Sequence, residues 1–287
     1  MNLTLSQEQQ LLRDTVAKLF ATESSPVRVR AAEATGFDPR LWQQLLELGI
    51  PTMRVPASAG GGDMGVLDAV LVGGEGGRHL APGPLGESIP AARLLAALEA
   101  PEATRLLDQV HNGALITFAP QPLLAGSPVA LPGAGAAEAV LVLQDDTLYA
   151  LLGLAGDTVE PNLGSDSVRL FDASSPVEKL TLASGASACA AFEAALVEWE
   201  LPRAAMLNGL ARQAIQLAAD YSRERIQFGK AIGSFQGIAH PLADALTEVE
   251  GGQLLTWHAV WSIAQGEAEA AAQVSMAWWW ATQCTGR

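Results

Sequence analysis

The hydrophobic pattern changes its period twice along this 287-residue chain, and no other feature limits the possible folds as strongly. Over residues 1–112 and 198–287, apolar residues recur at the three- and four-residue spacing of helices. Residues 113–197 instead carry short apolar runs bounded by Gly, Pro and Asp, which is typical of strands. We therefore predict an α+β, mainly α fold with three successive domains: a helical domain at 1–112, a small β-barrel or sheet domain at 113–197, and a helical-bundle domain at 198–287.

The N-terminal part contains two helices with clear start signals. Residues 3–22 are amphipathic, with Ser6 as the expected N-cap and Gln9 as its capping-box partner. A second helix is expected from its cap Asp38 to Leu48, because a proline follows the cap and a glycine ends the pattern.

Two shorter helices are expected over residues 66–73 and 89–98. The glycine clusters Gly60–Gly62 and Gly73–Gly77 are interpreted as loops. Because neither cluster follows a strand, neither is predicted to bind a phosphate.

The central part contains five expected strands, each a short apolar run that ends at a turn residue. They are Ala114–Phe118, Ala139–Leu143, Thr147–Leu152, Val168–Phe171 and Lys179–Leu182.

From Glu200 the pattern becomes helical again. We expect one helix to Gln227, a second over 236–265, and a third from Glu267. The third pattern is still helical at the last residue, so we expect further helices beyond it in the native protein. Its run Trp278–Trp280 cannot face one way on a helix, and it is expected to fill a helix–helix or subunit interface.

Composition excludes several classes of protein. The net charge of −14 would repel nucleic acid. The two cysteines are too far apart for a disulfide scaffold, no residue cluster suggests a metal site, and this usage fits a cytoplasmic location. No secretory signal opens the chain and no stretch is apolar enough to cross a membrane. Positive charge gathers in one segment, which makes it the expected site for an anionic ligand: Arg203, Arg212, Arg223, Arg225 and Lys230.

Three segments resemble the acyl-CoA dehydrogenase family, whose members also place a β domain between two helical domains. LTLSQEQQLLRDTVAKLFATE (Leu3–Glu23) resembles the first helix of the family. LWQQLLELGIPTMRVPASAGG (Leu41–Gly61) is similar to its second helix and the glycine-rich loop on the substrate side. The most specific match is YSRERIQFGKAIGSFQGIAHPLAD (Tyr221–Asp244), which keeps the Arg, the FG and FQ pairs and the LAD of the family at their intervals.

The last segment has a chemistry that its residues support directly. Arg225 and Phe228 are three apart, so on a continuous helix they share one face. A cation beside an aromatic ring, followed by glycines and Gln236, can bind a diphosphate and an adjoining ring system. The resemblance implies that Arg225, Gln227, Phe228 and Gln236 contact FAD held mainly by a neighbouring subunit.

A structural alternative stays open for the same residues. Arg225 could stabilise the C-terminus of its helix, with Phe228 packed in the core. His240, on the following helix, is interpreted as a buried structural histidine rather than a catalytic one.

The resemblance also shows what this chain lacks. The family removes the α-proton of an acyl-CoA thioester with a glutamate. Trp199 occupies one of the two positions known for that glutamate, and the other lies beyond Arg287. Glu200 is one residue away, about 100° around a helix, and is a weak candidate. The stretch Thr117–Pro128 also departs from the family loop that holds flavin and substrate.

These departures leave three functional readings. In the first, the chain is an FAD-dependent subunit of a heteromer, such as a heterotetramer for lipid or steroid thioester degradation, and completes the flavin site of a catalytic partner. In the second, it is a self-sufficient enzyme that assembles as a homo-oligomer, and its base is Glu200 or a residue beyond Arg287. In the third, it is a helical scaffold without flavin. The resemblance implies an acyl-CoA substrate and an electron-transfer flavoprotein or similar acceptor.

Overall fold

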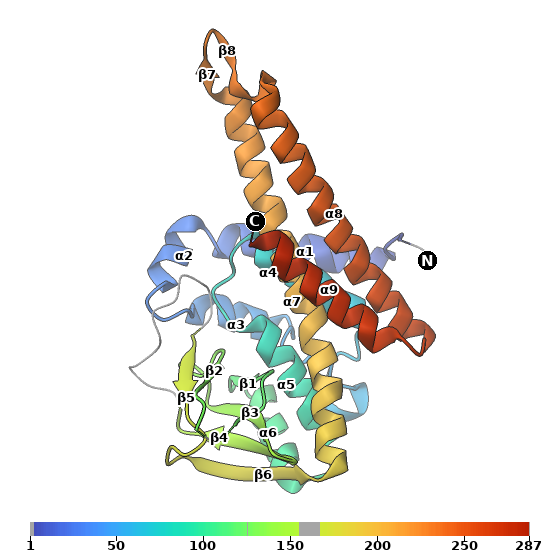
Figure 1. The fold of residues 1–287 in the computed structure, drawn as a ribbon. Coiled ribbons are helices and arrows are strands. Elements are labelled where there is room, and N and C mark those ends of the chain that lie inside the picture. The colour runs from blue at the N-terminus through green and yellow to red at the C-terminus, as the bar shows by residue number, and fades with distance from the viewer. Residues whose placement is uncertain (1–2, 125, 155–166, 287) are drawn as a thin grey trace. The chain divides into compact units, whose positions relative to one another are not determined.

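The computed structural model describes residues 3–124, 126–154 and 167–286, and these form two compact units (Figure 1). The first, here called the helical unit, contains residues 3–20, 70–79 and 200–286. The second, the mixed unit, contains the other described residues, 21–69 and 80–199 with the gaps given above. The chain is mainly helical with small sheets, as predicted. The division into three successive domains stays a prediction.

The mixed unit begins with short helices whose ends follow local signals. Helix α3 (Pro39–Glu47) starts at the predicted cap, because Asp38 accepts hydrogen bonds from the backbone N–H groups of Arg40 (2.9 Å) and Leu41 (3.2 Å). The other carboxylate oxygen of Asp38 accepts two hydrogen bonds from Arg28, at 2.9 and 2.6 Å. The helical elements that accompany α3 here are α2 (Pro26–Ala32), the 3-10 turn η1 (Ala57–Ala59), α5 (Leu85–Ala97) and α6 (Pro101–His111).

Helices α2 and α6 were not expected from the sequence. Each begins at a proline, Pro26 and Pro101, and each is short. Proline at the first helical position costs no hydrogen bond, because that N–H has no partner inside the helix in any case. Pro26 and Pro101 are therefore the starting residues of these two helices.

The β part contains all five expected strands and one more. Strands β1, β3, β4 and β6 form a sheet in the order β1-β3-β4-β6, parallel between β1 and β3 and antiparallel elsewhere. The additional strand β2 pairs with β5 in a separate antiparallel ribbon. The bounds are β1 (Ile116–Phe118), β2 (Val129–Leu131), β3 (Ala139–Gln144), β4 (Thr147–Leu152), β5 (Arg169–Phe171) and β6 (Glu178–Ser184).

Helix α7 (Ala186–Glu224) begins 14 residues earlier than expected. Its first turns are rich in alanine, the residue with the highest helix propensity, and they lie in the stretch that we had assigned to the β domain. Phe192 packs on Phe118 of β1, with ring centroids 5.2 Å apart. This contact fixes the start of α7 against the sheet.

In the helical unit, α1 (Gln7–Glu23) begins with the predicted capping box. The Gln9 N–H donates to Ser6 Oγ at 3.2 Å, and the Ser6 N–H donates to Gln9 Oε1 at 3.1 Å. The helix starts at Gln7, directly after its cap Ser6, rather than at residue 3, because the cap and the residues before it lie outside the helix.

Helix α4 (Val66–Arg78) corrects the interpretation of Gly73–Gly77 as a loop, because these glycines are helical. A Cβ on Gly73 would lie 2.5 Å from the carbonyl oxygen of Pro202, and one on Gly77 would lie 1.9 Å from that of Met206. Helices α4 and α7 therefore cross with their backbones in contact. This tertiary contact offsets the low helix propensity of glycine.

Helices α8 (Gln236–Gln265) and α9 (Ala270–Thr285) complete the helical unit. The bounds of α8 are those expected, and α9 starts three residues later than expected. In the tryptophan run, the Trp280 indole N–H donates to the Glu248 carbonyl at 3.0 Å, whereas Trp279 is exposed. One tryptophan thus lies between helices, as predicted, and its neighbour faces outward.

Candidate functional site: the loop between helices α7 and α8

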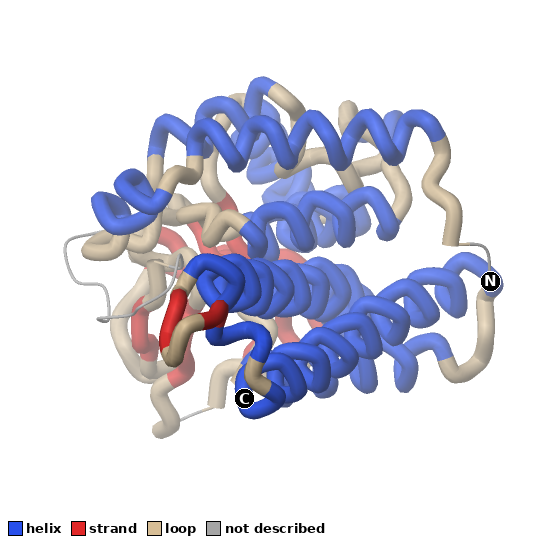
Figure 2. Tube along the Cα trace, turned by 90° about the horizontal axis from the view of Figure 1, so that it is seen from above, coloured by secondary structure: helices blue, strands red, loops and turns tan. Residues whose placement is uncertain are grey.

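The residues expected to bind a cofactor lie together at one end of the α7–α8 helical hairpin. This tip loop, residues 225–236, contains a two-stranded ribbon of β7 (Ile226–Gln227) and β8 (Lys230–Ala231) and the 3-10 turn η2 (Ile232–Ser234). The hairpin extends beyond α9, with the ribbon at its far end (Figure 1). Viewed from above, the ribbon lies over the end of the hairpin (Figure 2).

The backbone of the tip loop corrects the expected helical pairing of Arg225 and Phe228. Helix α7 ends at Glu224, so the two residues do not share a helix face. Phe228 and Gly229 form the turn of the ribbon, with φ values of 53° and 80°. Two positive φ angles match the tight turns that join antiparallel strands. A positive φ is unusual for a bulky residue, and such backbone strain is concentrated at functional sites.

Gly233 allows the loop to return close to helix α7. A Cβ at this position would lie 2.7 Å from the hydroxyl and 3.1 Å from the carbonyl oxygen of Ser222, which is buried. The Ile232 N–H also donates to the Arg225 carbonyl at 2.9 Å. These contacts give the exposed loop a defined conformation.

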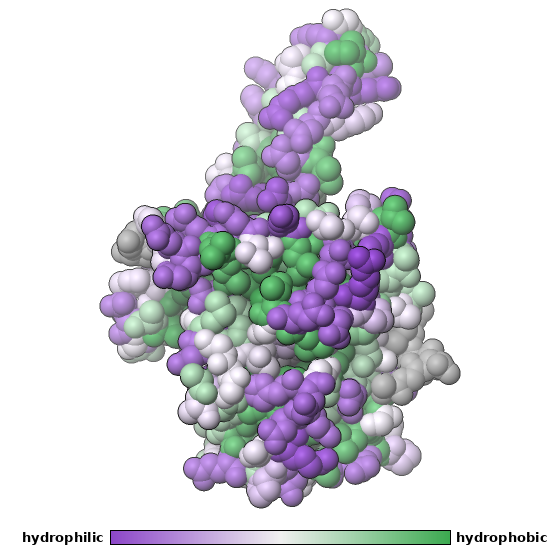
Figure 3. Space-filling model, turned by 180° about the vertical axis from the view of Figure 1, so that it is seen from behind, coloured by the Kyte–Doolittle hydropathy of each residue, from purple (hydrophilic) through white to green (hydrophobic). Residues whose placement is uncertain are grey.

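The side chains of the tip loop point to solvent. Phe228 is 92% exposed, which rules out the alternative that it packs in the core. The side chains of Arg225, Gln227 and Gln236 are exposed and have no hydrogen-bond or ion-pair partner within the described part of the chain. In Figure 3 the end of the hairpin carries hydrophobic residues beside hydrophilic ones. The loop therefore presents a cation, two amides and an aromatic ring that its own chain does not use.

Phe228 is supported by Phe235, which the sequence reasoning did not select, and through it by Lys230, one of the cations of the expected anion site. Phe235 packs edge-on against Phe228, with ring centroids 6.1 Å apart. Lys230 places its Nζ 4.3 Å from the centroid of the Phe235 ring, within cation–π distance. Phe235 belongs to the FQ pair that was quoted for the family match, and that was the available signal.

The tip loop also attracts anions. Arg225 and Lys230 carry positive charge, and α8 begins at Gln236. The first N–H groups of a helix lack intrahelical partners, and the aligned peptide dipoles make this end positive. A negatively charged group is therefore favoured here, although the whole chain carries a charge of −14.

At the position of the family base, three consecutive residues have partners within the chain. The Trp199 indole N–H donates to Glu87 Oε1 at 2.9 Å, and both side chains are buried. Glu198 forms a two-point ion pair with Arg54, one bond of which is 2.8 Å long. Glu87 was not selected from the sequence, although a carboxylate in the otherwise mostly apolar helix α5 is a usable signal.

Glu200, the weak base candidate, directly follows Trp199 in α7 and is half-buried. Burial raises its pKa above the ordinary value of 4.5, and a 3.3 Å hydrogen bond from the Ser275 hydroxyl acts in the opposite direction. A raised pKa suits a general base, but this carboxylate already accepts a hydrogen bond.

The structure also bears on the expectations for His240, for the stretch Thr117–Pro128, and for metal sites and membrane spans. His240 is exposed, so its interpretation as a buried histidine was wrong. The stretch Thr117–Pro128 returns to the sheet, because the Leu123 N–H donates to the Leu143 carbonyl at 2.7 Å. Ala125, within it, lies outside the described residues. Among described residues, no cluster of three or more His, Cys, Asp or Glu side chains could hold a metal, and no helix has the length and apolar character needed to cross a membrane.

Comparison with known proteins identifies the family. The acyl-CoA dehydrogenase N-terminal domain matches residues 6–96, and the acyl-CoA dehydrogenase C-terminal domain matches residues 192–285. Together these matches cover more than half of the chain. The chain therefore belongs to the acyl-CoA dehydrogenase family, a family of oxidoreductases.

Particular relatives agree with this assignment. Acyl-CoA dehydrogenase IpdE2 of Mycolicibacterium smegmatis is 33% identical over 252 residues, which cover 85% of this chain and 74% of the relative. The crystal structure of the ChsE4–ChsE5 complex from Mycobacterium tuberculosis matches with a TM-score of 0.80 and 27% identity, over 99% of this chain and 85% of that one. A variant of the Tcur3481–Tcur3483 steroid ACAD matches with a TM-score of 0.77 and 26% identity, over 98% and 84%.

Proposed function

We propose that this chain is one subunit of a heteromeric acyl-CoA dehydrogenase and completes the FAD site of a catalytic partner. The observation that carries the proposal is the tip loop. It exposes Arg225, Gln227, Phe228 and Gln236, and no described residue of the chain is a partner of the three polar side chains. Side chains displayed in this way fit a ligand that another subunit holds.

The residues of the tip loop fit the parts of FAD. The guanidinium of Arg225 would donate charge-assisted hydrogen bonds to the diphosphate, close to the positive end of α8. Phe228 would lie against a ring of the cofactor, while Gln227 and Gln236 would supply amide hydrogen bonds. When bound, FAD supplies the acceptor for the hydride that leaves the β-carbon of the acyl group. This chain's contribution is to bind and orient that cofactor.

Residue 199 is a tryptophan rather than a glutamate, and this favours a non-catalytic role for the chain. Trp199 cannot accept a proton, and its N–H is committed to Glu87. The indole and the carboxylate bury each other, so this position serves packing rather than proton transfer. The partner would then supply the glutamate.

The substrate class follows from the relatives. The ChsE4–ChsE5 structure is a complex of two differently named chains, and the Tcur3481–Tcur3483 protein is described as a steroid ACAD. We accordingly propose a steroid- or lipid-derived acyl-CoA thioester as substrate. An electron-transfer flavoprotein or a similar carrier would reoxidise the flavin, and the complex would be a heterotetramer located in the cytoplasm.

A second candidate function is a self-sufficient dehydrogenase. It is favoured by Glu200, whose half-buried carboxyl has a raised pKa as a general base requires. In a scaffold that had lost flavin altogether, the exposed, strained Phe228 would have no evident use.

Visible absorption spectra separate the three functions. The chain is purified alone, the second dehydrogenase subunit is purified alone, and the two are then mixed and passed through a sizing column with added FAD. We expect the flavin bands only in the mixed complex. Stoichiometric flavin in this chain alone would favour the self-sufficient enzyme, and a colourless stable complex would favour the scaffold.

A further inference from the structure

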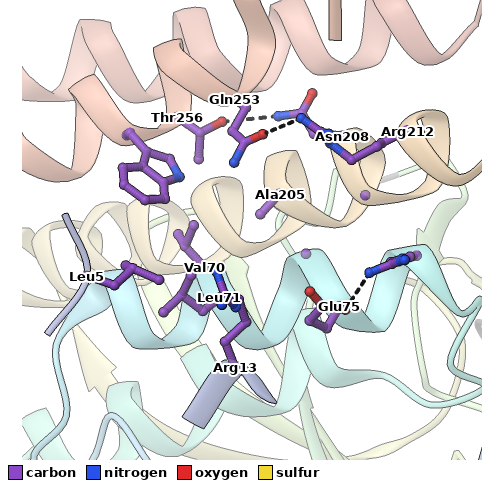
Figure 4. Close-up of a pocket in the computed structure, with 14 residues that line it drawn as sticks. Leu5, Arg13, Val70, Leu71, Glu75, Ala205, Asn208, Arg212, Gln253 and Thr256 are labelled. Atoms are coloured by element: carbon purple, nitrogen blue, oxygen red, sulfur yellow. Dashed lines mark hydrogen bonds and ion pairs between the residues drawn. The ribbon is translucent and has the colours of Figure 1, made fainter. Parts of the chain in front are cut away.

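The helical unit contains a cavity that the proposed function does not use. Its volume is about 310 Å³, within the range of pockets for small molecules. Its walls come from four segments of the unit: α1 and the residues before it, α4, α7 and α8 (Figure 4). Along α7 it lies near Asn208, whereas the tip loop begins at Arg225. At 1.5 Å per residue these positions are about 25 Å apart, so the cavity and the tip loop are separate sites.

The charged wall of the cavity is positive. Arg13, Arg78 and Arg212 reach it from three different helices, and Glu75 is the one acidic side chain among its lining residues. In Figure 4, Arg212 extends from α7 toward Gln253 of α8, and the two are joined by a 3.2 Å hydrogen bond. This local excess of positive charge contrasts with the net charge of −14 for the whole chain.

The arginines keep donors for a ligand although each has a partner. Arg13 pairs with Asp14 and Arg212 with Glu250, and all four side chains are 44–69% exposed. Ion pairs this exposed contribute little and exchange readily with solvent. A guanidinium carries five N–H donors, so the existing partners leave several of them available.

Apart from the polar side chains of Asn208, Gln253 and Thr256, the remaining wall is apolar, and part of it is bare backbone. Val70, Leu71 and Ala205 are buried behind the cavity, and Leu5 and the indole of Trp257 close it. Gly74 and Gly209 leave this part of the wall as bare backbone, because a Cβ on Gly209 would lie 2.1 Å from the Gly74 carbonyl oxygen. An apolar body of modest size can therefore be enclosed next to the arginines.

Glu75 opposes an anion and sets the balance of the site. Its carboxylate lies 3.7 Å from an Arg78 nitrogen, and its side chain is only 16% exposed. Burial raises the pKa of Glu75, while Arg78 and then Arg13 lower it. Neutralising this carboxylate would remove the one acidic charge among the lining residues and one partner of Arg78, whose Nε also donates to Gln213 at 3.0 Å.

We propose that this cavity binds a small organic anion, a monocarboxylate with a compact apolar body, through Arg13, Arg78 and Arg212. The carboxylate would accept charge-assisted hydrogen bonds from the guanidinium groups. The body would lie against Leu5, Val70 and Trp257. The cavity volume of about 310 Å³ is too small for the long acyl chain of a whole lipid. Because the ligand contacts four segments, binding would also stabilise the helical unit.

The test uses the full chain and three probes with one body and different head groups: hexanoate, hexanol and hexylamine. Calorimetric titration gives the Kd, and thermal unfolding gives the stabilisation. We expect saturable binding of hexanoate, with hexanol at least tenfold weaker and no binding of hexylamine. Arg212→Gln and Arg13→Gln should each weaken hexanoate about tenfold, the effect of one charge-assisted hydrogen bond.

Two further variants keep the test decisive. Glu75→Gln keeps the shape of the side chain and should tighten hexanoate about five- to tenfold. Arg105→Gln removes an exposed arginine of α6 that is not among the residues lining the cavity, and should leave the affinity unchanged. The proposal would be overturned if hexanoate showed no saturable binding or if hexylamine bound equally well or more tightly. It would also be overturned if Glu75→Gln bound hexanoate more weakly, or if Arg105→Gln lost as much hexanoate affinity as the variants of Arg13 and Arg212.

Discussion

The buried pair of Trp199 and Glu87 makes a quantitative prediction about the position of the missing base. The two residues are 112 positions apart, are joined by a 2.9 Å hydrogen bond, and are 9% and 0% exposed. A buried hydrogen bond contributes about 0.5–1.5 kcal/mol, and removing one partner leaves the other to bear its desolvation, which costs about 1–3 kcal/mol. Trp199→Phe should therefore lower the free energy of unfolding by at least about 2 kcal/mol, since it also loses buried ring surface.

A double-mutant cycle separates the hydrogen bond from the packing. Trp199→Phe and Glu87→Leu each break the bond, and the double variant removes both partners. The double variant should then cost less than the sum of the single variants by about 1–3 kcal/mol. Urea unfolding followed by circular dichroism measures all four proteins. Additivity within about 0.5 kcal/mol would refute the reasoning and show that Trp199 does not depend on Glu87.

Three other predictions concern Glu200, Gly77 and Phe235. The raised pKa of Glu200 means that the folded chain holds an extra proton above pH 4.5, so the free energy of unfolding falls as pH rises from 4.5 through the folded pKa. Glu200→Gln should remove this pH-dependent loss, as measured by urea titrations across pH. The same variant should leave the activity of a reconstituted complex within a few-fold, whereas loss of a true base would lower it about 10²–10⁴-fold. Gly77→Ala should destabilise the chain by about 1–3 kcal/mol in thermal unfolding because of the carbonyl of Met206, whereas Gly74→Ala, with its nearest atom at 3.8 Å, should not. Phe235→Leu should weaken FAD retention by the complex about two- to tenfold, because Phe228 and Lys230 lose the ring against which they pack; unchanged retention would remove this supporting role.

Local signals predicted the parts of the fold that local interactions determine. The capping box at Ser6 and the cap at Asp38 both form as expected, because a cap satisfies N–H groups of its own helix. Helix α8 has the expected bounds, and its C-terminus has Gly266 in the left-handed region, with a φ of 68°. These features involve residues that are neighbours in the sequence.

The errors occurred where distant residues decide the structure. The glycines of α4 are helical because α7 packs against their backbone, and nothing near them in the sequence indicates that contact. The early start of α7 was hidden because its first turns pack against the sheet through Phe192 and Phe118. The pairing of Trp199 with Glu87 also joins distant segments and could not be predicted from one sequence.

The residues selected for the candidate site lie together, their backbone differs from the predicted one, and their role as FAD contacts stays a prediction. The segment Tyr221–Asp244 led to Arg225, Phe228 and Gln236, which are exposed together in the tip loop. The helix was expected to reach Gln227 and to carry Arg225 and Phe228 on one face, although it ends at Glu224. The structure instead places Phe228 in a tight turn, which accounts for its 92% exposure.

The FAD affinity of the two-subunit complex tests the central claim most directly. The partner subunit is kept unchanged and combined with either the natural chain, Arg225→Ala or Arg225→Lys, and the Kd for FAD and the melting temperature of this chain are measured together. A contact in trans predicts that Arg225→Ala weakens FAD about ten- to a hundredfold with an unchanged melting temperature, because Arg225 is exposed and its side chain has no partner in the described part of the chain. Arg225→Lys should recover only part of this loss, since an ammonium lacks the planar fork of donors. An unchanged Kd, with or without a lower melting temperature, would contradict the claim and leave Arg225 a structural residue of its own chain.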